Sequence, residues 1–145
     1  MQRRQYIWLL ALEVYETTNM FLTCSLLTGE EEVIMPGATH ISETIKMADL
    51  SRHYDMAVID EAQMISDPSR GGAWTAAILG LCADEIHICM APHAESIIRK
   101  LIAYCEDEVV ETDRFAKGET SVVVATDAIG MGLNFPVKRQ GICGQ

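Results

Sequence analysis

Short apolar runs alternate along the chain with stretches that favour helices, and turn or breaker residues close many of the runs. Residues 56–59 are apolar without a break, and residues 121–125 are apolar after Ser121; both patterns are typical of strands buried on both faces of a sheet. Residues 85–90, closed by Pro92, form a third candidate strand. The stretches 73–83 and 94–104 favour helices.

The first fifty residues continue the same alternation. Residues 9–19 contain no breaker and predict a helix that ends near Asn19, and residues 21–27 predict a strand stopped by Thr28 and Gly29. A loop follows through residues 30–37, and residues 41–50 predict a short helix. Alternating strands and helices of this kind indicate an α/β fold with a mostly parallel sheet.

Size and charge limit what the chain can be. Its 145 residues are close to one average domain, and 49% apolar with 22% charged residues predicts a folded core. A formal net charge of −10 excludes proteins that hold nucleic acid by bulk positive charge, although a local groove could still bind it. Five acidic residues fall between residues 106 and 113, which predicts a solvated loop or an edge strand there.

The cysteine, histidine and hydropathy patterns argue against disulfide-rich, zinc-binding, secreted and membrane-spanning proteins. The five cysteines contain no C-x-x-C pair, so we expect reduced thiols and a cytoplasmic protein. The four histidines share no zinc spacing with one another or with the cysteines. The start of the chain imitates a short secretory signal, but Glu13 ends the apolar run of residues 7–12. No window is long and apolar enough for a membrane span, and no membrane partner is expected.

The sequence Asp60-Glu61-Ala62-Gln63 directly follows the predicted strand 56–59. Adjacent carboxylates at the end of a buried strand suit Mg²⁺-dependent phosphoryl transfer, in which one holds the metal and the other polarises water. The same pattern also occurs where a helix simply begins, and the motif alone leaves both interpretations open.

A second motif, Thr126-Asp127-Ala128-Ile129-Gly130-Met131-Gly132-Leu133-Asn134, follows the predicted strand 121–125. Two glycines flanked by a hydroxyl, a carboxylate and an amide allow the backbone to approach phosphates. A turn that needs glycine only for its geometry would look the same.

Taken together, these motifs resemble those of superfamily 2 helicases, most closely the RNA helicase of the mitochondrial degradosome and its bacterial relatives. The resemblance rests on residues 9–16, 25–31, 58–65, 70–89 and 125–134, in the family's order. It implies an incomplete RecA-like helicase lobe with a short strand–turn remnant of a second lobe. The expected domains are residues 1–113 and 114–145.

The resemblance also implies roles for individual residues. Asp60 would bind Mg²⁺, Glu61 would activate water and Gln63 would couple ATP to RNA. The RNA backbone would be contacted by Leu10, Glu13, Thr28, Gly29, Thr44, Thr126 and Asp127, and the nucleotide by Gly130, Gly132 and Asn134. The implied cofactors are ATP and Mg²⁺. The implied partners are RNA, as a single strand or a duplex with a 3′ overhang, and an exoribonuclease or parent helicase. The implied compartment is cytoplasmic in bacteria and mitochondrial in eukaryotes.

The chain departs from the family at several points. No G-x-x-x-x-G-K-[ST] sequence occurs, so the amides and lysine that hold the β- and γ-phosphates are missing. The family's arginine-rich final motif is also absent, and only 65 residues separate Glu61 from Asp127, too few for two complete lobes. We therefore expect an internal gap between about residues 113 and 121.

Three hypotheses remain after these departures. The first is a piece, or an internally deleted copy, of an ATP-dependent RNA helicase that is inactive as this chain alone. The second is a non-catalytic module that binds RNA or a protein. The third is a gene-fragment product with an incomplete sheet, which would aggregate or oligomerise through its unpaired edges.

Overall fold

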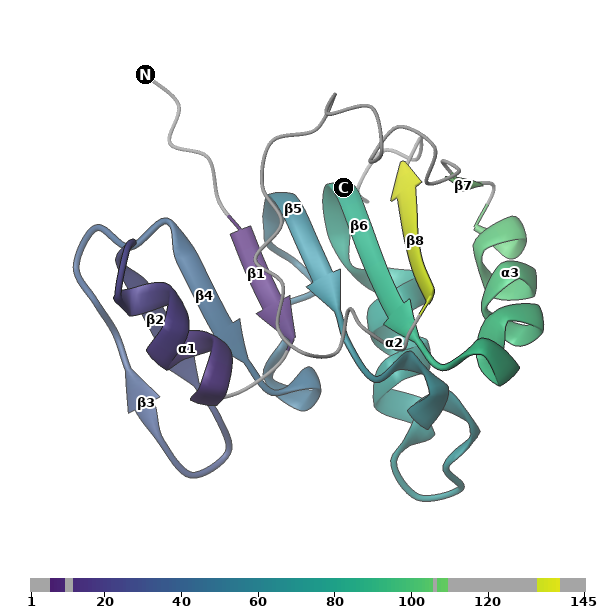
Figure 1. Cartoon of the computed structure of the whole chain (residues 1–145), viewed down its shortest axis with the longest axis horizontal. Coiled ribbons are helices and arrows are strands. Elements are labelled where there is room, and N and C mark those ends of the chain that lie inside the picture. Colours follow the sequence, from purple (N-terminus) through teal and green to yellow (C-terminus); the bar gives the residue numbers. More distant parts are fainter. Residues whose placement is uncertain (1–5, 10–11, 106, 110–132, 139–145) are drawn as a thin grey trace.

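The computed structural model describes residues 6–9, 12–105, 107–109 and 133–138 (Figure 1). Within these residues, eight strands form one sheet in the order β3-β2-β4-β1-β5-β6-β8-β7. The strands are β1 (Tyr6–Leu9), β2 (Cys24–Leu27), β3 (Glu32–Val33), β4 (His40–Glu43), β5 (His53–Ile59), β6 (Cys82–Met90), β7 (Glu108–Val109) and β8 (Leu133–Lys138). The helices are α1 (Leu12–Asn19), α2 (Gly71–Gly80) and α3 (Glu95–Tyr104), with short 3-10 turns η1 (Ile45–Met47), η2 (Ala62–Ser66) and η3 (Pro92–Ala94).

The middle of the sheet is parallel, and its margins are antiparallel. Strands β2, β4, β1, β5 and β6 pair in parallel, whereas β3 pairs antiparallel with β2, β8 with β6 and β7 with β8. The α/β prediction with a mostly parallel sheet is confirmed at this level. Because the five central strands run the same way, all their carboxyl ends lie at one edge of the sheet.

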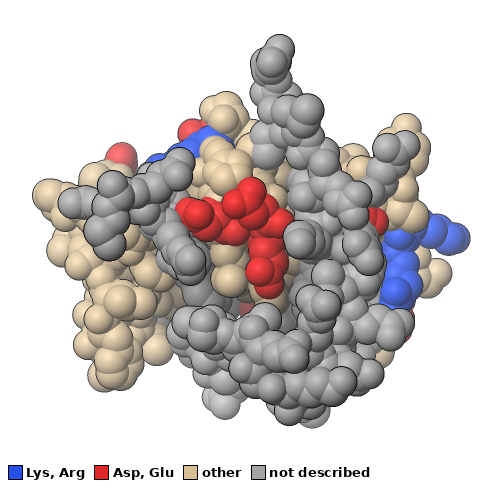
Figure 2. Space-filling view, turned by 90° about the horizontal axis from the view of Figure 1, so that it is seen from above, with Lys and Arg blue, Asp and Glu red and all other residues tan. Residues whose placement is uncertain are grey.

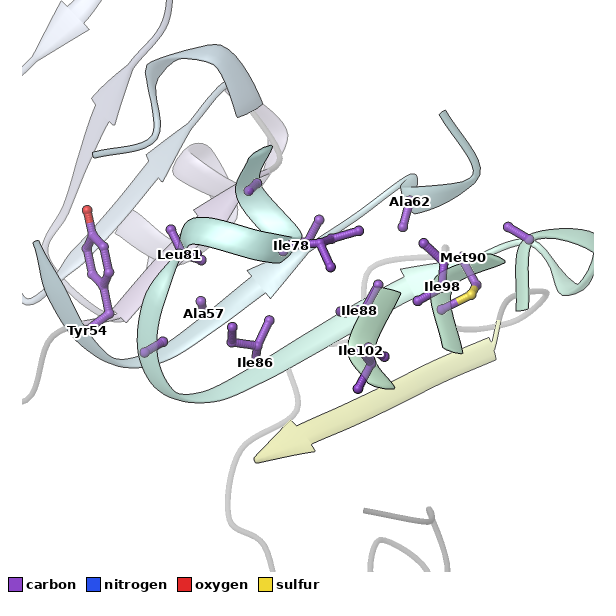
Figure 3. Packing of buried hydrophobic residues seen from close by; sticks show 14 residues of the cluster. Tyr54, Ala57, Ala62, Ile78, Leu81, Ile86, Ile88, Met90, Ile98 and Ile102 are labelled. Carbon is purple, nitrogen blue, oxygen red and sulfur yellow. The ribbon is translucent and has the colours of Figure 1, made fainter. Parts of the chain in front are cut away.

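The main core lies between β5 and β6 and the two helices that follow them (Figure 3). Along β6 alternate residues face this core: Ile86, Ile88 and Met90 are each at most 3% exposed. The core also contains Ile59, Ile78, Leu81, Ile98 and Ile102. Each such side chain contributes roughly 1.5–3 kcal/mol of hydrophobic stabilisation, so this layer fixes the position of the end of β5.

The smaller half of the domain surrounds β2 and β4. Helix α1 packs against both strands and buries Val14 and Thr18, which lie one turn apart on the helix. Asn19 closes the α1–β2 connection: its side-chain amide donates to the Cys24 carbonyl at 3.3 Å and its Oδ1 accepts the Cys24 N–H at 3.1 Å.

Two sequence predictions in this half are wrong. Leu9 ends strand β1 instead of beginning a helix, and residues 40–43 form strand β4 where a helix over 41–50 was expected. Only the turn η1 within that range is helical. The physical reason is the position of the two strands, since β4 pairs with β2 and β1, and β1 with β4 and β5. Pairing on both sides outweighs a local helical pattern.

Other predictions are shifted rather than wrong. Helix α2 begins and ends earlier than expected, and Cys82 and Ala83 belong to β6. The predicted strand 21–27 is shorter, since β2 starts at Cys24 and Phe21 is 81% exposed. Within the acidic run, Glu108–Val109 forms an edge strand, one of the two alternatives.

The last described segment joins the same sheet, because β8 pairs with β6 from Met90↔Leu133 to Glu85↔Lys138. Residues 110–132, which contain the predicted strand 121–125 and the expected domain boundary, lie outside the described residues. That boundary stays a prediction.

Two further expectations concern membranes and thiols. Within the described ranges, no helix has the length and apolar character needed to cross a bilayer. Cys24, Cys89 and Cys105 are free thiols, but Cys82 is disulfide-bonded, so the expectation of reduced cysteines is wrong for that residue.

Candidate functional site: a carboxylate pair at the carboxyl edge of the sheet

Several of the predicted site residues follow parallel strands directly and therefore share one edge of the sheet. Asp60 follows β5, Thr28 follows β2 and Thr44 follows β4. The Thr44 N–H donates to the Leu27 carbonyl at 3.1 Å, which joins the ends of β2 and β4. Glu13 lies in the first turn of α1, which begins after β1 at the same edge.

Asp60 is held in place from two directions. Its side chain is nearly buried, with 8% of the residue exposed, and its Oδ1 accepts the Glu61 N–H at 2.7 Å. Its carbonyl accepts the indole Nε1–H of Trp74 on α2 at 2.9 Å. Burial, and to a smaller extent the Asp60 charge, raises the pKa of Cys89 on the neighbouring strand to about 11, so that thiol stays protonated. Asp60 therefore presents a carboxylate in a fixed position.

Glu61 adopts a backbone conformation that favours glycine. Its φ of 53° and ψ of 35° lie in the left-handed region, and it is the one non-glycine residue with positive φ in the part of the chain that the structure describes. A side chain there costs about 1–2 kcal/mol. The conformation lets the Glu61 carbonyl accept the Met64 N–H at 2.9 Å, which starts η2, while the side chain remains exposed. Backbone strain of this kind is often found at functional sites.

Gln63 connects the ends of two strands. Its Nε2 donates to the Glu61 carboxylate, and its Oε1 accepts the backbone N–H of Ala91 at 3.1 Å. Ala91 directly follows β6. The amide thus holds the Glu61 carboxylate and joins it to the segment after the neighbouring strand.

The segment beyond η2 is closely packed and well capped. Asp67 Oδ1 accepts the N–H groups of Ser69 at 2.9 Å and Arg70 at 2.8 Å, and these bonds, with the Ser69 hydroxyl, lower the pKa of Asp67 to about 2. Gly71, the first residue of α2, lies so close to η2 that a Cβ there would be 2.3 Å from the Ile65 carbonyl oxygen. Helix α2 thereby holds η2, and with it Gln63, in position.

The opposite edge has a different electrostatic character. Figure 2 views the amino ends of the central strands and shows acidic side chains gathered in the middle of that face, with Lys and Arg at its margins. Asp84 of β6 lies near that end, where its Oδ1 pairs with His53 Nε2 at 2.9 Å. The carboxyl edge is the candidate site because Asp60, Glu61 and Gln63 of the motif lie there, directly after β5.

Comparison with known proteins assigns the family. The model of the DEXQ-box helicase domain of Suv3 matches residues 6–114. The chain belongs to the Suv3 family of DEXQ-box helicases. It is 46% identical over 123 residues to the mitochondrial ATP-dependent RNA helicase DExH18 of Arabidopsis thaliana, covering 84% of this chain and 16% of that protein.

Two further relatives agree with this placement, and one solved structure resembles the chain in fold. The mitochondrial ATP-dependent RNA helicase SUPV3L1 of Homo sapiens is 46% identical over 110 residues, 72% of this chain and 14% of that protein. The Drosophila melanogaster SUV3 homolog is 43% identical over 130 residues, 84% of this chain and 16% of that protein. An rRNA methylase from Escherichia coli matches in fold alone, with a TM-score of 0.50 and 13% identity over 97% of this chain and 58% of that one.

The Suv3 match places the Asp60-Glu61-Ala62-Gln63 sequence inside the helicase domain, and the motif-based resemblance is confirmed. The chain spans only about one sixth of the length of these relatives. Of the residues expected to contact nucleotide or RNA, Asn134 lies in β8, opposite Cys89 of β6. Leu10, Thr126, Asp127, Gly130 and Gly132 lie outside the described residues.

Thr28 and Gly29 form a tight turn between β2 and β3. The Thr28 hydroxyl donates to the Glu31 carbonyl at 3.1 Å and accepts the Glu31 N–H at 2.8 Å, so it is already used within the turn. A Cβ on Gly29 would meet nothing within 4 Å, so the backbone there is open. The RNA contacts expected of these two residues stay a prediction. The open backbone of Gly29 is better placed for an RNA contact than the Thr28 hydroxyl, which is already hydrogen-bonded within the turn.

Sequence reasoning missed two residues that shape the site. Trp74 anchors Asp60 from α2, and the signal for it was a single indole in a helix of otherwise small and aliphatic residues. Ala91 holds Gln63 through its backbone N–H, a role that any residue except proline could fill and that no side-chain pattern reveals.

Proposed function

We propose that residues 6–109 are part of the ATP-hydrolysing lobe of an RNA helicase. In this proposal Asp60 binds Mg²⁺, Glu61 takes a proton from the attacking water and Gln63 couples the site to RNA. The observation that carries it is the hydrogen-bonded arrangement in which Gln63 bridges Glu61 and Ala91 across the ends of β5 and β6. Within a helicase family, a bridge of this kind provides a path from the water-activating carboxylate to a neighbouring strand.

The donor atoms present suit Mg²⁺. Mg²⁺ prefers oxygen ligands, and in phosphoryl-transfer sites it commonly keeps several waters while one or two carboxylates and the substrate phosphates complete its shell. Asp60 supplies such a carboxylate. Among the described residues no group of three or more His, Cys, Asp or Glu side chains could hold a metal, consistent with a site completed by water and phosphate. When bound, Mg²⁺ would neutralise charge on the phosphate oxygens.

The chain's own residues would then orient the nucleophile. The Glu61 carboxylate is held by the Gln63 amide, so its remaining lone pairs are available to accept a proton from water. The Trp74 indole and the Glu61 N–H restrain Asp60. Fixed carboxylates need no reorganisation during the reaction, which is the main source of catalytic advantage in such sites.

RNA is the proposed second ligand, contacted through Leu10, Glu13, Thr28, Gly29, Thr44, Thr126 and Asp127, with nucleotide near Gly130, Gly132 and Asn134. Support for RNA comes from the names of the relatives and from the shared carboxyl edge that carries Thr28, Gly29 and Thr44. Contacts to sugar and phosphate carry little sequence information, so binding without strong sequence preference is expected. An exoribonuclease or the parent helicase is the proposed protein partner.

This chain alone is not expected to hydrolyse ATP. It contains no G-x-x-x-x-G-K-[ST] sequence to hold the β- and γ-phosphates. Positioning and charge neutralisation supply most of the rate enhancement in phosphoryl transfer. Their loss raises the activation free energy by several kcal/mol, which slows the reaction roughly a thousandfold or more. A non-catalytic module that binds RNA or a protein is the second candidate, and this absence together with the net charge of −10 favours a protein ligand for it.

The compartment follows the relatives in this proposal. All three relatives described above carry "mitochondrial" in their names. We infer a mitochondrial location if the organism is eukaryotic, and a cytoplasmic one if it is bacterial.

Calorimetric titration with Mg²⁺-ATP tests the assignment of the site. Heat of binding that the double variant Asp60→Asn/Glu61→Gln abolishes is the expected result. The matched control is Asp84→Asn/Glu85→Gln, which removes the same adjacent pair of charges from the opposite end of the sheet and is expected to bind as the wild type does. Equal binding by both double variants would contradict the site. Salt-dependent RNA binding without any nucleotide binding would favour the non-catalytic module.

A further inference from the structure

Glu43 is a buried carboxyl group that the proposed ATP site does not use. It is the last residue of β4 and only 2% of it is exposed. One of its side-chain oxygens, Oε1, is buried without a hydrogen-bond partner. A buried charged oxygen without a partner is costly, and such a group is commonly neutral instead.

The residues around Glu43 come mostly from the segment that follows it. The backbone N–H of Asp49 hydrogen-bonds to the Glu43 carboxyl. Tyr54 of β5 donates its hydroxyl to the Asp49 carbonyl at 3.5 Å, and the Arg52 guanidinium lies over the Tyr54 ring at 5.5 Å. Residues 44–52 therefore close over the carboxyl group and are held partly by it.

The charges near Glu43 oppose one another. Burial, followed by the Asp49 charge, raises its pKa to about 7, and Arg52 counteracts this only in part. Tyr54 stays a neutral phenol, since burial and then Glu43 itself raise the pKa of its hydroxyl to about 12. On β2 the residue in register with Glu43 is Leu27, which does not titrate, and Lys46 of η1 is exposed.

His40, at the other end of β4, is a second titratable residue of this strand. Burial lowers its pKa below the usual value for histidine. A test must separate these two residues.

We propose that Glu43 is a proton-operated latch on residues 44–52: its neutral carboxyl remains buried and holds the segment through Asp49, and its ionised form leaves this position and releases the segment. The latch concerns the conformation of residues 44–52 and holds whether or not the chain binds ATP or RNA. Since Thr44 begins this segment, opening of the latch would also move one of the expected RNA contacts.

The direction of the pH dependence follows from the two states of the carboxyl group. Its folded-state pKa lies above the ordinary value of 4.5, so the neutral carboxyl stabilises the closed segment fully below that value. This stabilisation is lost as the pH rises through about 7. The segment is thus closed in acid and opens toward alkaline pH.

Amide NMR on the full chain tests the latch. In the wild type, the amide signals of Asp49 and Thr44 are expected to shift with a midpoint near 7. In Glu43→Gln, which keeps the shape and cannot ionise, this shift is expected to vanish. The matched control Glu16→Gln removes one exposed negative charge from α1 and should leave the midpoint unchanged. A His40 titration would persist in Glu43→Gln and would thereby be recognised.

Chymotrypsin cleavage provides an independent readout that needs no variant. Cuts at Met47 and Leu50 within the segment are compared with the cut at Phe21, which is 81% exposed and serves as an internal reference in the same digest. The ratio is expected to rise about tenfold per pH unit below the midpoint and to level off above it. A ratio independent of pH, an Asp49 midpoint between pH 4 and 5, or the same midpoint in Glu43→Gln would each overturn the latch.

Discussion

Gly71→Ala and Gly72→Ala are expected to change stability in opposite directions, although the two glycines are neighbours in α2. A Cβ at position 71 would lie 2.3 Å from the Ile65 carbonyl oxygen and 2.8 Å from its carbonyl carbon, whereas one at position 72 would meet nothing within 4 Å. Ordinary contacts of this kind exceed 3.4 Å, so η2 would have to retreat by about an ångström.

The magnitudes follow from these contacts. Overpacking against a backbone that cannot rotate away costs about 2–3 kcal/mol, so Gly71→Ala should lose that much stability. Gly72→Ala replaces glycine by the best helix former at an open position and should gain up to about 1 kcal/mol. For a chain of this size, 1 kcal/mol corresponds to about 3 °C in Tm.

Urea unfolding followed by circular dichroism measures both variants under identical conditions. The expected difference between them is about 2–4 kcal/mol, with Gly71→Ala the less stable. Gly71→Ala should also weaken the Gln63–Ala91 bond, because η2 carries Gln63, and this is visible as faster hydrogen exchange at the Ala91 amide. If both variants shifted stability the same way, or if Gly71→Ala were neutral, the close packing of α2 on η2 would be refuted.

Substitutions at three further positions test individual contacts of the site. Glu61→Gly should be more stable than Glu61→Ala by about 1 kcal/mol in urea unfolding, because the left-handed backbone favours glycine; equal stabilities would argue against a φ of 53°. Trp74→Phe keeps an aromatic ring but leaves the Asp60 carbonyl without its indole donor. We expect this variant to lose about 1 kcal/mol of unfolding free energy in the same assay. A loss near zero would mean that water replaces the bond. Asp67→Ala should make the free energy of unfolding depend less on pH in acid. The lowered pKa of Asp67 gives stability that is present above about pH 4 and lost as the pH falls through about 2. An unchanged pH dependence in acid would contradict the capping role.

The strand that carries the candidate site could be predicted because its sequence allows little else. Residues 56–59 are continuously apolar and end at two carboxylates, a pattern typical of a parallel strand with function at its end. The structure places β5 there and buries Ala57 and Ile59 completely. Pattern and packing agree at this point, and Asp60 and Glu61 follow the strand directly, as predicted.

Strand β4 could not be predicted in the same way, because its neighbours decide its conformation. Ile41 and Ser42 pair with Ser25 and Leu26 of β2 on one side and with β1 on the other. None of these partners is close in sequence, and local periodicity over residues 41–50 favoured a helix. Tertiary pairing outweighed local preference here.

The hydrogen bonds that define the site also depend on distant residues. Gln63 and Ala91 are 28 residues apart, and Trp74 reaches Asp60 across 14. The motif identified Asp60, Glu61 and Gln63 as the relevant side chains, but only the packing of α2 and β6 shows how they are held. The burial of Glu43 had no signal at all, since a glutamate before Thr44 looks like a surface residue.

In the proposed function the carboxyl-edge pair Asp60 and Glu61, and not the acidic opposite face, binds the metal–nucleotide complex. Paramagnetic broadening by Mn²⁺-ATP, with Mn²⁺ in place of Mg²⁺, distinguishes the two positions, since it detects weak binding and reports where the metal lies. We expect broadened amide signals for Glu61, Gln63 and Ala91 in the wild type, and recovery of all three in Asp60→Asn. Broadening centred on Asp84 and Glu85, or broadening at Glu61 that survives Asp60→Asn, would contradict it.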